Sequence, residues 1–221
     1  MEKGLVQATE KTVEAAFSSI DILERLIKEK LKDGVDYYSK LFPGQTKPVL
    51  GDSGAIVIMN VFNLRPVYKL LEHVVEGREG EERIRYVIGT ELISRMDGTG
   101  VSEGVGSATS DEVKYKYRWV EEDVLREEYG YNDEELEKLK KQMRTLHRDG
   151  KPVKVWFYQV RNPEILDLDN TILKMAAKRS LVDAVMGLPG VSRVFTQDLG
   201  ERKRPPSHKS LEELAQTGKT E

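Results

Sequence analysis

The segment from Ile165 to Leu188 constrains the fold most strongly, because its apolar residues fall on two faces of one helix. At 100° per residue, Leu173, Ala177, Leu181, Ala184 and Leu188 line one face, and Leu168, Ile172, Met175, Val182 and Met186 line another. A helix with two apolar faces must be covered on both sides. We therefore expect a long C-terminal helix, ended by Pro189-Gly190, that packs on a sheet on one side and on a second layer or another subunit on the other.

The middle of the chain predicts that sheet. Strand-like patterns run over residues 67–75, 83–94 and 100–109. Asp97-Gly98 between the last two is a strong hairpin signal, because both residues tolerate the positive φ of such turns. We expect an α+β fold in which a curved antiparallel β-meander packs on the C-terminal helix. An N-terminal helix precedes it within residues 1–34, and residues 54–62 form either helix or strand.

Within residues 110–160, the pattern indicates an insertion into the α+β core. Asn132 with Glu135 makes a capping box, and the helical stripe that ends at Gly150 consists of Leu136, Leu139, Met143 and Leu146. We expect a charged helical insertion at about 120–150, followed by a strand at 153–160. The domain organisation is then a helix over 1–34, an α+β core over 35–200 and a flexible tail over 201–221.

Composition excludes several classes of function. The chain has no cysteine, three histidines far apart in sequence and a formal charge of −3. Thiolate metal sites and cysteine nucleophiles are therefore excluded, and we expect neither a metal site nor a cofactor. No apolar run reaches membrane-spanning length and the N-terminus lacks a secretory pattern, so a cytoplasmic protein without a membrane partner is expected. A nucleic-acid surface would have to be a local basic patch.

The C-terminal helix carries the first candidate cations, Lys178 and Arg179, with Lys174 one turn earlier. They could hold a nucleic-acid backbone, where charge supplies affinity. The alternative for Arg179 is an intrahelical ion pair with Asp183, and Lys174 is expected to be solvated.

A second cluster of cations alternates with aromatic residues over 114–119. As a strand, this segment would place Lys114, Lys116 and Arg118 on one face and the aromatic rings on the other. A stacking platform needs both on one surface, so the separation favours rings in the core, with the cations left to follow phosphates. Lys47 and Arg65 are further candidate DNA contacts.

An enzymatic alternative rests on Glu164, Asp167 and Asp169 before the last helix, as oxygen ligands for Mg²⁺ in a nuclease. Helix capping explains these acids more simply. The glycines at 98, 100, 104 and 106 do not form a nucleotide-binding loop, so nucleotide hydrolysis is not expected.

Two stretches resemble a known family. Residues 86–107 (YVIGTELISRMDGTGVSEGVGS) are similar to the central hairpin, and residues 170–187 (NTILKMAAKRSLVDAVMG) to the closing helix, of single-strand annealing proteins of the Rad fifty-two superfamily, including Sak-like and Erf-like relatives. In that family a Lys-Arg pair on the closing helix faces the DNA groove. By position, Lys178 and Arg179 match that pair.

The resemblance implies a non-enzymatic protein that binds single-stranded DNA and anneals strands without ATP in recombination or repair. It also implies a homo-oligomer, either a ring or a filament. A second hypothesis is a scaffold or interaction protein that kept the fold and lost DNA binding, with the expected 132–148 helix docking a protein partner. The Mg²⁺-dependent nuclease is the third.

Overall fold

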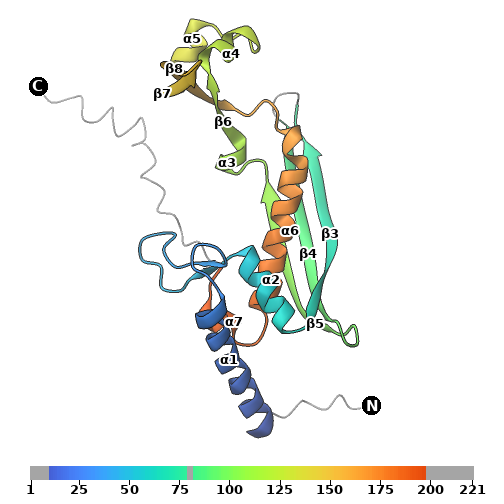
Figure 1. The fold of residues 1–221 in the computed structure, drawn as a ribbon. Helices are drawn as coiled ribbons and strands as arrows, with labels where there is room; N and C mark the ends of the chain where they lie inside the picture. Colours follow the sequence, from blue (N-terminus) through green and yellow to red (C-terminus); the bar gives the residue numbers. More distant parts are fainter. Residues whose placement is uncertain (1–9, 79–81, 198–221) are drawn as a thin grey trace, which may run out of the picture. The chain divides into compact units, whose positions relative to one another are not determined.

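The structure is a computed structural model that describes residues 10–78 and 82–197 (Figure 1). It combines α-helices with antiparallel sheets and a long helix late in the chain, so the expected α+β class is confirmed. The chain divides into two compact units. Of the described residues, the first unit comprises 10–66, 91–104 and 181–197, and the second comprises 67–78, 82–90 and 105–180.

The helices are distributed along the whole described chain. They are α1 (Glu10–Lys30), α2 (Asp52–Val61), α3 (Val113–Lys116), α4 (Glu122–Glu127), α5 (Asp133–Glu137), the 3-10 turn η1 (Leu166–Leu168), α6 (Asp169–Met186) and α7 (Val191–Val194).

The strands form three sheets with the orders β1-β2, β3-β4-β5 and β6-β8-β7. Their bounds are β1 (Tyr37–Tyr38), β2 (Val49–Leu50), β3 (Leu64–Glu76), β4 (Arg83–Ser94), β5 (Gly100–Thr109), β6 (Tyr117–Glu121), β7 (Lys140–Arg148) and β8 (Lys151–Arg161). The strands predicted at 83–94 and 100–109 are confirmed, and the segment at 54–62 lies in helix α2 and the residue after it.

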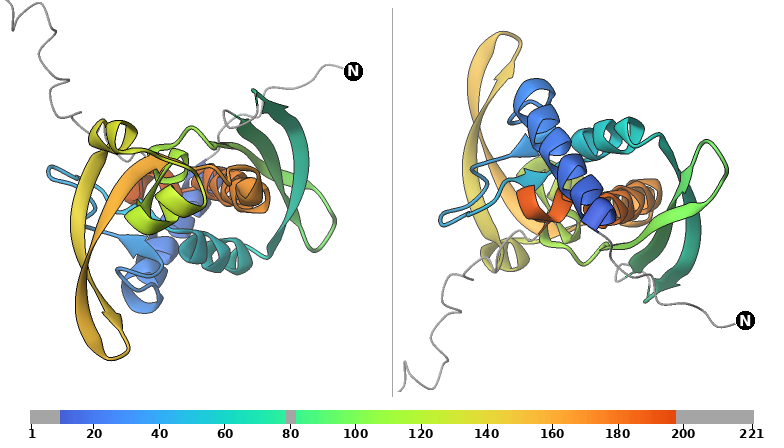
Figure 2. Two further views of the ribbon diagram at one scale, coloured as in Figure 1. Left: turned by 90° about the horizontal axis from the view of Figure 1, so that it is seen from above. Right: turned by 90° about the horizontal axis from the view of Figure 1, so that it is seen from below.

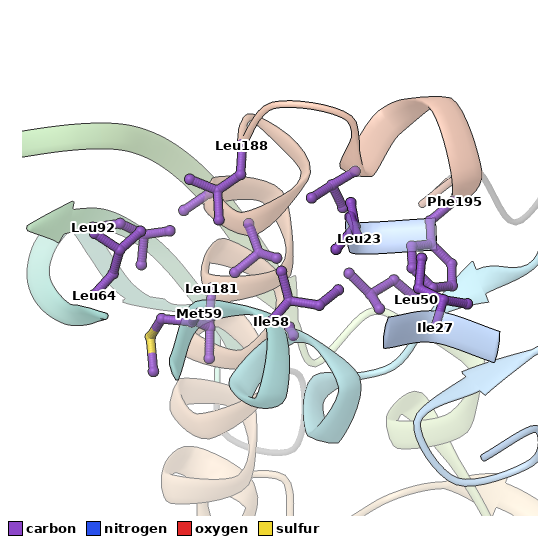
Figure 3. Packing of buried hydrophobic residues seen from close by; sticks show 14 of the residues in the cluster. Leu23, Ile27, Leu50, Ile58, Met59, Leu64, Leu92, Leu181, Leu188 and Phe195 are labelled. Carbon is purple, nitrogen blue, oxygen red and sulfur yellow. The ribbon is translucent and has the colours of Figure 1, made fainter. Parts of the chain in front are cut away.

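In the first unit, the core joins α1, α2 and the end of α6 (Figure 3). Leu23 of α1, Ile58 of α2 and Leu188 after α6 are all buried in this cluster. Gly98 has φ +76° in the β4–β5 turn, which confirms the hairpin predicted at Asp97-Gly98.

In the second unit, the apolar side of β4 packs against α6. Ile84, Tyr86 and Ile88 share a buried cluster with Ile172 of the helix. Gly106 of β5 allows the close approach, because a Cβ there would lie 2.2 Å from the backbone nitrogen of Ser180. The strand–helix contact therefore depends on a residue without a side chain at this position.

The sheet β6-β8-β7 has an antiparallel register that runs from Tyr117↔Arg161 and Lys140↔Gln159 to Arg148↔Lys151. One face of this sheet packs on Leu125 of α4 and Leu136 of α5, through its residues Val120, Tyr158 and Val160. Strands β7 and β8 form a ribbon, drawn in yellow to orange in Figure 2.

The prediction of a helix over 132–148 is wrong. The capping box of Asn132 and Glu135 is present, but the helix that it starts ends at Glu137. Residues 140–148 are strand β7, which pairs along its whole length with β8. Asp149 (φ +51°) and Gly150 (φ +77°) form the turn between them, so pairing with a neighbouring strand overrides the helical spacing of the leucines.

The prediction of a strand over 114–119 is correct only from Tyr117 onward. Residues 113–116 form one turn of helix, α3, and Tyr115 is buried against the β4–α6 cluster. The two-faced alternation of cations and rings therefore does not apply to Lys114 and Lys116.

The tail predicted for residues 201–221 lies outside the described residues. Among the helices that are described, none combines the length and the apolar character needed to cross a lipid bilayer.

Candidate nucleic-acid interface

The three candidate cations of α6 differ in their surroundings. Lys174 and Lys178 are exposed, whereas Arg179 is half-buried in a bidentate ion pair. The guanidinium of Arg179 donates to both carboxylate oxygens of Glu112, at 2.6 and 2.8 Å, and to the carbonyl of Ser107 at 2.6 Å. The carboxylate that holds Arg179 is thus Glu112, while Asp183, the partner considered from sequence, accepts a hydrogen bond from Gln197 at 2.6 Å.

This ion pair perturbs both of its members. Burial raises the pKa of Glu112, but the hydrogen bond and the charge of Arg179 outweigh it, so the pKa of Glu112 lies below its usual 4.5. The hydrogen bond to Glu112 raises the pKa of Arg179 above its ordinary value. A phosphate that approached Arg179 would therefore compete with an ionised, bidentate carboxylate.

The candidate cations at 114–118 are also paired with acids. Lys114 Nζ lies 3.6 Å from Glu112 Oε2, and Lys116 Nζ lies 3.6 Å from Asp111 Oδ1. Arg118 donates to Glu164 at 2.5 Å and to the Tyr129 hydroxyl at 3.1 Å. The positive charge of this segment is therefore compensated locally.

Lys47 and Arg65 belong to the other unit. Lys47 Nζ donates to the Ser192 carbonyl at 3.0 Å, which fixes it at the start of α7. Arg65 is exposed at the start of β3. Both cations lie on the surface of the first unit.

Two of the three acids considered as metal ligands, Glu164 and Asp169, have other partners. Glu164 pairs with Arg118, and Asp169 accepts hydrogen bonds from the Tyr86 hydroxyl at 2.9 and 3.1 Å. His73 stacks on Tyr86, and its Nε2 lies 3.7 Å from Asp169 Oδ1. In residues 10–78 and 82–197, no three His, Asp or Glu side chains are grouped so as to hold a metal ion. These contacts favour a structural role for these two acids.

The hairpin β7–β8, which we call the basic hairpin (residues 140–161), carries a charge that sequence reasoning missed. Seven of its 22 residues are Lys or Arg and one, Asp149, is acidic. Arg148 pairs with Glu121 of β6, and Arg161 donates to the Glu82 carbonyl at 3.3 Å. Within the described part of the chain, no carboxylate lies within ion-pairing distance of the hairpin cations Lys140, Lys141, Arg144, Lys151 and Lys154.

Aromatic rings share the surfaces of the basic hairpin with these cations. On one face, which we call the outer face, the Arg144 guanidinium lies 5.7 Å from the ring centre of Trp119 and 4.9 Å from that of Phe157. On the other, the helix-side face, Lys141 Nζ lies 5.3 Å from the ring centre of Trp156. The arrangement meets the condition for a stacking platform, because cations and rings occupy the same surfaces.

A local signal could have located this hairpin. Asp149-Gly150 has the same two-residue composition as Asp97-Gly98, and β-branched and aromatic residues follow it in β8. Taking Gly150 as a helix stop hid the turn.

In comparisons with known proteins, the sequence matches no protein-family model, and a search of curated proteins found no significant match.

Proposed function

We propose that this protein binds single-stranded DNA and promotes the annealing of complementary strands without ATP, as a homo-oligomer in a ring or filament. The observation that carries the proposal is the basic hairpin in a chain of net negative charge. It brings aromatic rings together with five cations, Lys140, Lys141, Arg144, Lys151 and Lys154, that have no carboxylate partner among the residues that the structure describes. The resemblance to Rad fifty-two annealing proteins supports the same activity. It also supports a curved meander packed on α6 as the family-like core.

In this proposal the main phosphate contact is the basic hairpin, in place of the cations of α6 and of residues 114–118. Arg179, Lys114, Lys116 and Arg118 are each held by a carboxylate, so their charge is already compensated. Lys140, Lys141 and Arg144 lie on an exposed strand at the edge of the sheet. Because neutralising a phosphate releases counterions, these three cations should dominate the affinity.

The test is binding of a fluorescent oligothymidylate by the full chain at low salt, measured by anisotropy. We expect Lys140→Ala with Lys141→Ala and Arg144→Ala to weaken binding by about tenfold or more. The matched control removes three exposed cations from α1, with Lys11→Ala, Arg25→Ala and Lys30→Ala, and should change affinity much less. Equal losses in the two triple variants, or no binding by the wild type, would overturn the proposal.

Annealing is tested separately from binding. Two complementary labelled oligonucleotides should pair faster with the wild type than alone, with no nucleotide added. The hairpin triple variant should lose this acceleration together with its affinity. Binding without any acceleration would remove annealing from the proposal and leave strand binding.

A second candidate function is a scaffold protein. It is favoured by the ion pairs that neutralise Arg179, Lys114, Lys116 and Arg118, the residues first considered for the groove. A docking helix over 132–148 is no longer part of this candidate, because residues 140–148 are a strand. The scaffold function would be supported if this chain captured a partner protein and showed no affinity for oligonucleotides at low salt.

A further inference from the structure

Charge alone does not explain how the basic hairpin could distinguish a single strand from a duplex, since both present phosphates. Unpaired bases offer a π-face on which an aromatic side chain can stack, and that face is hidden in a duplex. A ring that is exposed and flanked by cations is therefore the feature that selects single strands. The following inference rests on the proposed function.

A cation already lies over the aromatic rings of the outer face. The guanidinium of Arg144 lies over both Trp119 and Phe157, and both rings are only partly exposed. A base would have to displace Arg144 to reach them. The outer face is therefore suited to backbone contact more than to base contact.

The helix-side face offers a ring, Trp156, that is more exposed than Trp119 and Phe157, and the cation over it is the Nζ of Lys141, 5.3 Å from the ring centre. A stacked base would displace this one flexible lysine, whose charge could then follow the phosphates. Trp156 is 38% exposed, and Met143, its cross-strand partner, is 48% exposed. Farther along the same face Tyr158 is buried in the cluster with Leu125 of α4 and Leu136 of α5, so Trp156 is the exposed ring next to it on that face. A base stacked on it would also contact the Met143 thioether.

Cations lie on both sides of this ring. In the strand register, the Lys141–Tyr158 pair precedes the Met143–Trp156 pair, and the Thr145–Lys154 pair follows it, all on one face. Phosphates on either side of a stacked base would thus each meet an ammonium group. Lysine suits this task because its flexible stem lets the charge follow the backbone.

We infer that Trp156, with Met143 beside it and Lys141 and Lys154 on either side, is a stacking site for one unpaired nucleobase, and that it makes the basic hairpin selective for single-stranded nucleic acid. The ligand class is a single strand with bases, as distinct from a polyanion of any kind. Stacking leaves the pairing edge of the base accessible, which is compatible with annealing.

The experiment measures affinity of the full chain for three probes of equal length: oligothymidylate, an abasic oligomer with the same phosphates, and a blunt duplex. Wild type should bind oligothymidylate more tightly than the abasic oligomer. Trp156→Ala should weaken oligothymidylate binding on the order of 5- to 150-fold and leave abasic and duplex binding unchanged. Trp156→Phe keeps a ring and should recover most of the loss.

The matched control is Tyr68→Ala, which removes an exposed aromatic ring (48%) from β3, outside the basic hairpin. It should bind all three probes like wild type. Equal wild-type affinity for oligothymidylate and the abasic oligomer would overturn the inference and leave the proposed function intact. Absence of binding to every probe would overturn both.

Discussion

At the scale of single residues, the contact between Arg179 and Glu112 decides whether the cations of α6 are available to bind phosphate. A Lys-Arg step on a helix points to phosphate binding only if the cations are available. Here one of the two is held in a two-bond ion pair by Glu112, which also lies 3.6 Å from Lys114. The pair stabilises the turn between β5 and α3, and that turn sits against α6 in the second unit.

This ion pair should make stability depend on pH in the acid range. Because the pKa of Glu112 is lowered from 4.5 on folding, its contribution is fully present above about pH 4.5 and is lost as the pH falls through the lower pKa of the folded state. Glu112→Gln should lower the free energy of unfolding at neutral pH and flatten its decrease on acidification. Denaturant titrations across this range measure both effects.

The control for this variant is Glu103→Gln, an exposed glutamate of β5. Its stability profile should follow the wild type. If Glu112→Gln and wild type lose stability in parallel as the pH falls, the pair does not contribute to the acid sensitivity.

At the scale of elements, the packing of β5 on α6 depends on Gly106. A Cβ at this position would lie 2.4 Å from the Ala176 carbonyl oxygen as well as 2.2 Å from the Ser180 nitrogen, and both are backbone atoms that cannot rotate away. The strand and helix would have to separate to accept it.

Gly106→Ala should therefore destabilise the protein by about 1–3 kcal/mol or more. Gly89→Ala is the comparison, because the three atoms nearest to a Cβ there all belong to the Leu71 side chain, the first at 3.3 Å, and this side chain can adjust. Thermal unfolding of the two variants should show a large drop for Gly106→Ala and a small one for Gly89→Ala. Similar drops would mean that the close approach is not tight.

The turn of the basic hairpin is the second element with a backbone requirement. Gly150 has φ +77°, and a Cβ at this position would meet no neighbouring atom within 4 Å, so only backbone strain opposes a side chain. Gly150→Ala should destabilise the hairpin by about 1 kcal/mol, whereas Asp149→Asn should be tolerated, since asparagine also adopts positive φ. Amide hydrogen exchange measures this effect: it should become faster in β7 and β8 of Gly150→Ala and stay unchanged in Asp149→Asn. Equal exchange in the two variants would contradict the predicted backbone strain at Gly150.

How far sequence predicts this chain differs between elements. The strands at 83–94 and 100–109 and most of α6 are predicted correctly, because period, turn residues and helix-ending residues agree there. Residues 140–148 are predicted wrongly as helix, because Leu139, Met143 and Leu146 have helical spacing. Their pairing with β8 is a tertiary contact that the local pattern does not contain. For the candidate interface, sequence identifies the cations at 114, 116, 118 and 179, but the acids that hold Arg118 and Arg179, Glu164 and Glu112, are distant from them in the chain.

At the scale of the whole molecule, charge is distributed unevenly along the chain. The formal charge is −3, and the basic hairpin carries +6, so the remaining residues carry −9. An acidic remainder repels nucleic acid and would confine it to the hairpin. Binding should therefore be local, weakly dependent on the rest of the surface, and steeply dependent on salt.

The most direct test of polyanion binding through the basic hairpin is the salt dependence of oligothymidylate affinity. For single strands, the slope of log affinity against log salt is about −0.7 per phosphate contact. Removing Lys140, Lys141 and Arg144 together should make the wild-type slope shallower by about 2, while the α1 triple variant keeps it. A hairpin variant with the wild-type slope, or an α1 variant that loses it, would contradict the account.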